Sequence, residues 1–298
     1  MQRRAFLALT AGGLALAGLQ GSASPAPPAG LLSDFRWSMP DDRFGGFSAI
    51  EVMADGRDFV ALSDKGAFIR GRIRRDAAGA ITGVEAGPVT PLLAQGSETL
   101  RPGRTDSEGL AIAADGTAYV SFEGAARVLR YADLDGPAEN LPTHPDFAGL
   151  QRNSALEALA IGPDGALYTL PERSGGESRP FPVWRFRNGR WDQPFSLPRS
   201  GGFLAVGADF GPDGRLYLLE RQFAGLAGFA SRIRRFTLRG DRVTAAETVL
   251  QTPLGLHDNL EGISVWRDGA RGLVATLIAD DNFSFLFSTR LVEYRLPD

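Results

Sequence analysis

The sequence of 298 residues contains no cysteine and only two histidines, His144 and His257. The chain therefore has no disulfide, no thiol nucleophile and no thiolate zinc site. Two imidazoles are also too few for a histidine-rich zinc centre. Metal binding and catalysis are thus left to carboxylates, other oxygen ligands and basic side chains.

Several common enzyme motifs are missing as well. No Gly-x-Ser-x-Gly elbow occurs, which argues against a serine hydrolase of the α/β type. No glycine-rich phosphate loop of the Walker or dinucleotide type is present. The formal net charge of −3 gives no reason to expect nucleic acid or an anionic membrane as a partner. Beyond the first thirty residues, no sustained apolar stripe of helical period is found.

The N-terminal segment has the pattern of a bacterial export signal. Arg3 and Arg4 are followed by an apolar run over residues 8–19 and by the small-residue cleavage sequence Gly21-Ser22-Ala23. We expect a twin-arginine signal peptide at 1–23, a Pro/Ala linker at 24–30, and a periplasmic or secreted protein. The alternative is an uncleaved anchor, but a bilayer needs about 20 apolar residues, so we expect no membrane-spanning segment.

Asp-Gly pairs recur along the rest of the chain, each between two short apolar runs. They are Asp55-Gly56, Asp115-Gly116, Asp164-Gly165, Asp213-Gly214 and Asp268-Gly269. An Asp-Gly pair between alternating apolar runs predicts a β-hairpin. Repeats with strand chemistry at this spacing indicate a solenoid or a propeller, and four strands per unit favour an all-β β-propeller.

Five repeats are visible, which predicts one five- or six-bladed propeller domain over residues 31–298. A sixth, degenerate blade stays possible because the first unit is longer than the others. The last unit, residues 260–296, lacks a strand that residues 32–37 could supply by pairing with residues 291–296, so that the N- and C-terminal strands close the ring. A pair of β-sandwiches is the alternative architecture. We expect a monomer.

The repeat also predicts where the acids lie. An acid just before the first strand of a blade and an acid just after the second fall on the same rim of the disc, as for Glu108 with Glu123 and Glu157 with Glu172. Further acids expected on this rim are Asp64, Glu220, Glu261, Asp280 and Asp281. Two units break the pattern, with Ser48 and Val206 in the place of Glu108.

So many like charges need compensation. One solution is Ca²⁺, which takes six to eight oxygen ligands. The predicted metal ligands are Glu108, Glu123, Glu261, Asp281, Asn259 and Asn282. The other solution is pairing with Lys65, Arg173 and Arg221, which could cross to the next blade or hold an anion beside the metal. In a third interpretation, the acidic residues only shape turns.

Several motifs together resemble the phytase-like family, also described as "esterase-like activity of phytase". They are Phe44-Gly-Gly-Phe-Ser-Ala-Ile, Ala61-Leu-Ser-Asp-Lys-Gly, Asp106-Ser-Glu-Gly-Leu-Ala, Leu156-Glu-Ala-Leu-Ala, residues 206–221, Asn259-Leu-Glu-Gly-Ile and Ala279-Asp-Asp-Asn. The resemblance implies an exported β-propeller that hydrolyses phosphate or other esters. The third unit departs from its neighbours with Ala158 in place of Gly109 and Gly262, which weakens any expectation of close backbone approach to a ligand there.

The leading hypothesis from the sequence is a calcium-dependent esterase or phosphatase acting on a small anionic ester. Glu157 and Glu172 are the candidate bases, and Lys65, Arg173 and Arg221 are the candidate substrate-binding residues. Two other hypotheses stay open: a non-catalytic periplasmic propeller that binds an envelope ligand or acts as a scaffold, and a calcium-dependent lactonase. Whether the protein is an enzyme at all is left undecided by the sequence.

Overall fold

The computed structural model describes residues 25–298, so the predicted signal peptide over residues 1–23 lies outside the described residues. Strands dominate the described chain, with two short 3₁₀ helices, η1 (Pro145–Gly149) and η2 (Gly225–Ala227). Over this range, no helix has both the length and the apolar character needed to cross a bilayer.

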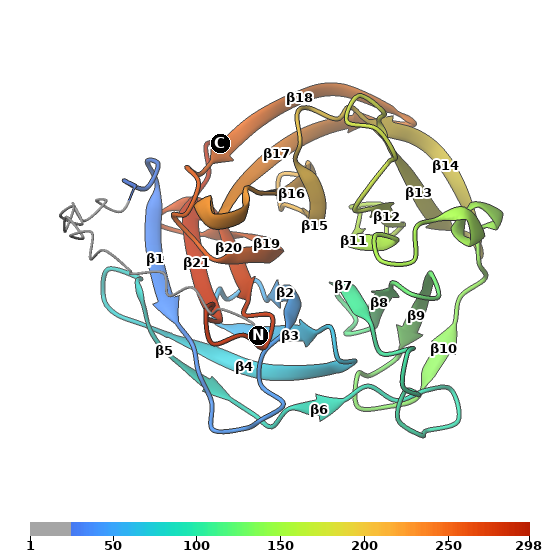
Figure 1. The fold of residues 1–298 in the computed structure, drawn as a ribbon, viewed down its shortest axis with the longest axis horizontal. Coiled ribbons are helices and arrows are strands. Elements are labelled where there is room, and N and C mark those ends of the chain that lie inside the picture. The colour runs from blue at the N-terminus through green and yellow to red at the C-terminus, as the bar shows by residue number, and fades with distance from the viewer. Residues whose placement is uncertain (1–24) are drawn as a thin grey trace, which may run out of the picture.

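The strands form five antiparallel sheets arranged as the blades of a propeller (Figure 1). Blade 1 contains β2 (Phe47–Val52), β3 (Asp58–Ser63), β4 (Ala67–Arg75) and β5 (Ile81–Ala86), with β6 (Thr90–Pro91) beside β4; blade 2 contains β7 (Ser107–Ile112), β8 (Ala118–Phe122), β9 (Arg127–Tyr131) and β10 (Ala138–Asn140). Blade 3 contains β11 (Leu156–Ile161), β12 (Leu167–Pro171), β13 (Phe181–Arg187) and β14 (Arg190–Leu197); blade 4 contains β15 (Leu204–Phe210), β16 (Leu216–Phe223), β17 (Phe229–Arg239) and β18 (Arg242–Gln251). Blade 5 contains β19 (Asn259–Asp268), β20 (Gly272–Asp280), β21 (Arg290–Arg295) and β1 (Leu31–Arg36).

The ring closes between the first and last strands of the described chain. β1 is the outermost strand of blade 5 and pairs antiparallel with β21, with Asp34 opposite Val292. This confirms the closure predicted from the sequence. Residues 25–298 form five blades and no sixth, so the β-sandwich alternative is wrong. Part of the extra length of the first unit forms β6, which belongs to blade 1.

Each Asp-Gly pair makes the turn between the innermost and second strands of a blade. In the first four turns, the carboxylate accepts a hydrogen bond from the N–H two residues further on, and the glycine has a positive φ of 65–88°. The aspartate mimics a backbone turn, and glycine adopts the left-handed region without a steric penalty. The hairpins predicted at these pairs are therefore confirmed.

The innermost strands β2, β7, β11, β15 and β19 surround the centre of the ring in Figure 1 and approach one another closely. A Cβ on Gly109 would lie 2.6 Å from Cβ of Leu159, and a Cβ on Gly262 would lie 2.8 Å from Cα of Ala49. These glycines therefore allow neighbouring blades to pack. Their role is inter-blade contact, and the difference at Ala158 carries no information about a ligand.

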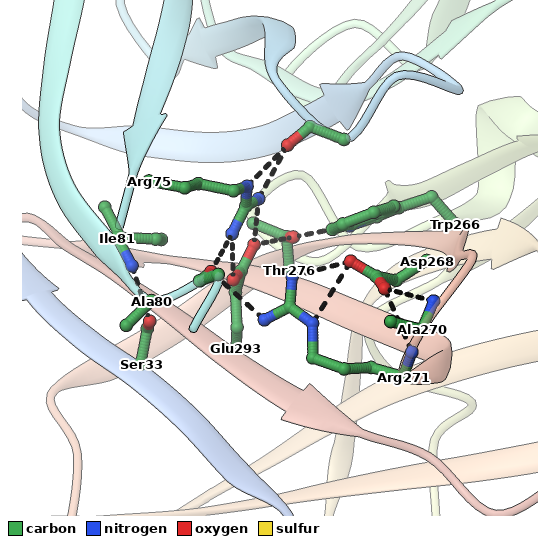
Figure 2. Close-up of polar contacts among 12 residues, drawn as sticks. Ser33, Arg75, Ala80, Ile81, Trp266, Asp268, Ala270, Arg271, Thr276 and Glu293 are labelled. Atoms are coloured by element: carbon green, nitrogen blue, oxygen red, sulfur yellow. Dashed lines mark hydrogen bonds and ion pairs between the residues drawn. The ribbon is translucent and has the colours of Figure 1, made fainter. Parts of the chain in front are cut away.

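A buried polar network joins blade 5 to blade 1 (Figure 2). Arg75 on β4 makes two contacts of 2.6 and 2.8 Å with the Glu293 carboxylate on β21, and Glu293 is fully buried. Thr276 donates to Glu293 at 2.8 Å and accepts from Trp266 Nε1 at 2.9 Å. A buried carboxylate with this many donors is fully compensated, as buried charges in folded proteins usually are.

Candidate metal centre on the acidic rim

A β-bulge interrupts each innermost strand near its beginning. The pairing shifts register between Phe47 and Ala49, Ser107 and Leu110, Leu156 and Ala158, Ala205 and Gly207, and Leu260 and Gly262. The residues at the bulges are Ser48, Glu108, Glu157, Val206 and Glu261. A bulge turns a side chain out of the regular pleat, and here it occurs at the position that carries glutamate in three of the five blades.

The second strand of each blade offers a second set of equivalent positions. In each blade, the residue that starts the bulge pairs with a residue of the second strand, and the position of interest comes directly after that partner. These positions hold Asp64, Glu123, Glu172, Arg221 and Asp280. We call these residues, together with Glu108, Glu157, Glu261, Asp106 and Asn259, the acidic rim.

The register of blade 4 corrects the prediction for Glu220. Glu220 pairs with Ala205, so its side chain lies on the other face of the sheet from that of Arg221. It is fully buried and accepts hydrogen bonds from Arg232 at 2.8 Å and Arg234 at 3.5 Å. Arg221 takes the rim position in this blade, and the prediction that Glu220 is a rim acid was wrong by one residue.

Three acids of the rim form a compact group that could hold a cation. Oxygen atoms of Asp106, Glu108 and Glu123 lie within 4.8 Å of one another. The sequence placed Glu108 and Glu123 together correctly. It missed Asp106 as a ligand, although its position two residues before Glu108, on the same face of a regular strand, was a signal for it.

The electrostatics of this acid trio are unfavourable without an added positive charge. Burial raises the pKa of Glu108 well above its ordinary value, and the charges acting on it, from Glu261, Glu123, Asp106 and Asp64, are all acidic. Burial also raises the pKa of Glu123 to about 7, even though Glu123 shares a hydrogen bond with Glu157. These carboxyl groups must either keep protons or bind a cation.

The same holds for the acids next to the trio. Burial first, and the surrounding acids second, raise the pKa of Glu157 well above its ordinary value. Burial and the charge of Glu261 raise the pKa of Asp280 to about 8. Asp64 keeps one buried oxygen, Oδ1, without a hydrogen-bond partner. An orphaned carboxylate oxygen beside an all-oxygen donor set fits a hard cation such as Ca²⁺.

Arg221 compensates the negative charge of two other rim acids, Glu172 and Glu261. Its Nη2 lies 3.1 Å from Glu172 Oε1 in blade 3, and its Nη1 forms an ion pair with Glu261 in blade 5. Nη1 also donates to Asn259 Oδ1 at 2.6 Å. Arg221 thus crosses to both neighbouring blades, as one sequence interpretation allowed. Its side chain is committed to rim acids.

The other two predicted basic residues pair with the acid that precedes them. Lys65 Nζ lies 2.7 Å from Asp64 Oδ2, and Arg173 Nε lies 3.0 Å from Glu172 Oε2. Both side chains are at least half exposed, so each could also reach a bound ligand.

Of the three other predicted metal ligands, one lies on the rim and two lie outside it. Asn259 lies within the rim and donates to Glu261 at 2.8 Å. Asp281 accepts from the Gly46 N–H, the Phe283 N–H and the Thr289 hydroxyl at 3.0–3.3 Å, so donors occupy both of its oxygens. Asn282 donates its backbone N–H to Asp280 Oδ1 at 2.7 Å. The structure therefore brings Glu108, Glu123, Glu261 and Asn259 onto one rim and leaves Asp281 and Asn282 in the adjoining loop.

A cavity of about 740 Å³ opens beside the candidate base Glu172. Its lining includes Pro171 and Arg173 on either side of Glu172, together with Ser174, Arg179 and Trp184. Glu172 itself is 5 % exposed and accepts a hydrogen bond from the Ser154 hydroxyl at 2.7 Å. The cavity is large enough for a small organic ligand, and two guanidinium groups contribute to its wall.

A second buried acid pair lies away from the rim. Glu51 and Asp209 occupy late positions in β2 and β15, whereas the bulges occur early in these strands. Burial raises the pKa of Asp209 to about 7, and the pKa of Glu51 lies well above its ordinary value because of burial and of Asp209. Asp209 also accepts the Val265 N–H at 2.6 Å. This pair was not anticipated from the sequence.

Residues 42–283 match the family model described as "Phytase-like: Esterase-like activity of phytase". None of the curated proteins matches the chain.

Among solved structures, a gluconolactonase from Xanthomonas campestris is 13% identical, with a TM-score of 0.47 over 84% of this chain and 72% of that one. Virginiamycin B lyase from Staphylococcus aureus is 17% identical, with a TM-score of 0.45 over 89% and 74%. The PQQ-bound aldose sugar dehydrogenase from Streptomyces coelicolor is 16% identical, with a TM-score of 0.46 over 90% and 99%.

Proposed function

The chain belongs to the phytase-like family, and from this premise we propose that it is a calcium-dependent hydrolase of phosphate or other esters. The observation that carries the proposal is the acid trio of Asp106, Glu108 and Glu123. Their oxygens lie within 4.8 Å of one another, and none of the three forms an ion pair with a base in the described chain. The trio lies on the rim that also carries the candidate bases Glu157 and Glu172.

A bound Ca²⁺ would polarise the ester oxygen and lower the pKa of a water molecule. The protein residues would supply the rest. Glu172 is held in place by Ser154 and Arg173, and its two chain neighbours line the cavity. In this proposal its carboxylate accepts a proton from the attacking water. Glu157, whose pKa burial raises well above its ordinary value, would donate a proton to the leaving oxygen.

The substrate's anionic group would contact the half-exposed Arg173 in the cavity, with Lys65 on the other side of the rim. Arg221 has a different role in this proposal. It neutralises Glu172 in blade 3 and Glu261 in blade 5, and so connects blade 4 to both of its neighbours. Export by the twin-arginine route, with a periplasmic or secreted location, stays a prediction from the sequence.

The test is an ester panel assayed on the protein lacking residues 1–23, with added Ca²⁺ and with EDTA. We expect hydrolysis of at least one phosphate or carboxylate ester, its loss in EDTA, and a drop of about 10²-fold or more in Glu108→Gln. Glu85→Gln, at an exposed acid on β5, is the matched control and should keep full activity. Hydrolysis confined to lactones would instead support the lactonase.

A binding propeller is the second candidate function, and the surface favours it in one respect. In the part of the chain that the structure describes, six large apolar side chains are exposed, in or beside loops that follow β16, β18 and β20: Phe223, Leu226, Leu254, Phe283, Phe285 and Leu286. Exposed apolar patches often mark interaction sites. No hydrolysis above background across the whole panel, together with a bound partner lost on replacing Phe285 and Leu286 by serine, would favour this function.

A further inference from the structure

A cavity of about 290 Å³ lies at the outer part of blade 2 and is lined by three arginines, Arg101, Arg104 and Arg127. We propose that this cavity binds a phosphate-type oxyanion and is a second anion site of the hydrolase, separate from the cavity that contains Arg173. The inference rests on the proposed function for its biological meaning. The binding itself can be tested independently.

Arg127 is the central observation. It is 8 % exposed, and its guanidinium lies over the Phe122 ring at 4.0 Å. Its hydrogen bonds go to two neutral carbonyl groups, Ala125 O at 3.0 Å and Arg104 O at 2.6 Å. These acceptors satisfy donors, but Arg127 has no carboxylate within ion-pair distance, and the charge of Asp106 offsets only part of the cost of its burial.

The other buried arginines of the described chain show what is missing at Arg127. Each of them forms an ion pair with a carboxylate: Arg75 with Glu293, Arg185 with Asp192, Arg232 and Arg234 with Glu220, and Arg235 with Glu247. At Arg127 the nearby guanidinium of Arg104 adds a like charge instead, and burial together with Arg104 lowers the pKa of Arg127 to about 10. Arg127 therefore stays charged at neutral pH.

The polar lining suits an oxyanion. Arg101 and Arg104 are exposed, so the cavity can be entered from solvent, and Gln95 and Asn140 contribute amide groups to its wall. Glu98 also lines the cavity and is its acidic member. Guanidinium groups bind phosphate through paired N–H donors, which makes an arginine group with a single acid a suitable site for a doubly charged oxyanion.

One loop connects this cavity to the candidate metal centre. Arg104 precedes Asp106 by two residues, and the Asp106 carbonyl accepts the Glu123 N–H at 2.9 Å. The charge of Asp106 also acts on Arg127. The loop of residues 104–106 thus links the cavity to the trio, and an anion bound in the cavity would not need Arg221, whose guanidinium is occupied by rim acids.

The test uses inorganic phosphate as the probe and the protein lacking residues 1–23, in EDTA so that calcium cannot contribute. We expect phosphate in the millimolar range to raise the melting temperature and to bind in calorimetry, more weakly as salt increases. Arg104→Gln and the double variant Arg101→Gln/Arg104→Gln, both at exposed positions, should weaken phosphate binding about tenfold or more. Arg130→Gln removes an arginine of the same blade that already pairs with Glu139, and should leave phosphate binding unchanged.

An absence of phosphate binding, or equal affinity in the wild type and the double variant, would overturn the inference. Weakening by Arg130→Gln as strong as that by Arg104→Gln would also overturn it, because the effect would then be one of net charge. Failure of the proposed function shows differently: calcium would give no thermal shift and no ester would be hydrolysed, while phosphate would still bind at the arginine cavity.

Discussion

The protein buries acidic groups in two regions, and the charges that surround these groups are opposite in sign. At the junction of blades 5 and 1, Glu293 is fully buried but receives two contacts from Arg75 and one from Thr276 (Figure 2). On the rim, Glu108 is almost as buried, and the charges acting on it are acidic. The same chain can therefore provide a guanidinium in direct contact with an acid that is structural. In the described chain no base forms an ion pair with the trio, which indicates a site that receives its positive charge from a ligand.

The largest expected effect comes from breaking the compensated region. Arg75→Met should destabilise the fold by about 3–5 kcal/mol, because it leaves the Glu293 carboxylate buried without its partner. Urea denaturation measures this. Arg74→Met is the control, since the exposed Arg74 lies 3.7 Å from the exposed Glu85 and should change stability by less than about 1 kcal/mol. Similar losses in the two variants would contradict this view of the junction.

Adding calcium should stabilise the protein through the uncompensated acids of the rim. At a hundredfold excess over its dissociation constant, Ca²⁺ should stabilise the protein by about 2.7 kcal/mol. The melting temperature, measured in EDTA and in Ca²⁺, gives the answer. The Arg75→Met variant should show a calcium-dependent rise of similar size, because it leaves the rim intact. An unchanged melting temperature in the wild type would mean that protons and Arg221 suffice to neutralise the rim.

The pH dependence of stability in EDTA should separate the two regions further. The folded-state pKa values of Glu123 and Asp280 are raised, to about 7 and about 8, so the native state binds more protons than the unfolded state between about pH 4 and pH 8. Stability should therefore fall as pH rises through this window, by up to about 1.4 kcal/mol per pH unit for each proton of difference.

Saturating Ca²⁺ should flatten most of this decline, because cation binding favours the ionised rim. The part that arises from Glu51 and Asp209, which lie outside the rim, should persist in calcium. Melting temperatures measured from pH 5 to pH 8 test both statements. Stability that increased with pH in EDTA would show that the rim acids are compensated within the protein.

The smallest effect concerns a single rim acid. Glu108→Gln should stabilise the calcium-free protein at pH 8 by about 1 kcal/mol, because glutamine replaces a buried carboxyl group whose ionised form is unfavourable among the neighbouring acids. The same variant should lose most of the calcium-dependent thermal shift. Glu85→Gln should do neither. If Glu108→Gln were destabilising in EDTA and kept the calcium shift, Glu108 would have a structural role.

Local patterns predicted most of the fold. The Asp-Gly pairs fixed the five hairpins, because the aspartate side chain and the glycine backbone each favour the same turn. Pairing of residues 32–37 with the last strand followed from counting strands in the final unit. The number of blades could not be decided, because nothing in the sequence shows that the extra residues of the first unit partly form β6 beside β4.

The site was harder to predict, for a reason that lies in the bulges. A strand has a period of two, so an error of one residue moves a side chain to the other face. For this reason the sequence predicts Glu220 as a rim acid, although Arg221 occupies the rim position of blade 4. Asp281 and Asn282 follow β20, where backbone donors of the loop decide what their groups contact. Arg127 gave no signal in the sequence, because only the fold shows that it lacks a carboxylate partner.

The pairing of β1 with β21 also has a consequence for how the protein folds. These strands contain residues 31–36 and 290–295, so their contacts are among the most non-local in the described chain. During synthesis, β1 has no partner until β21 has left the ribosome, and four blades can form while the ring is still open. We expect ring closure to be the late and slow step of folding, since contacts of high sequence separation form slowly. A strand edge that stays open until then is available to other chains, so dilute conditions should favour the monomer over strand-swapped assemblies.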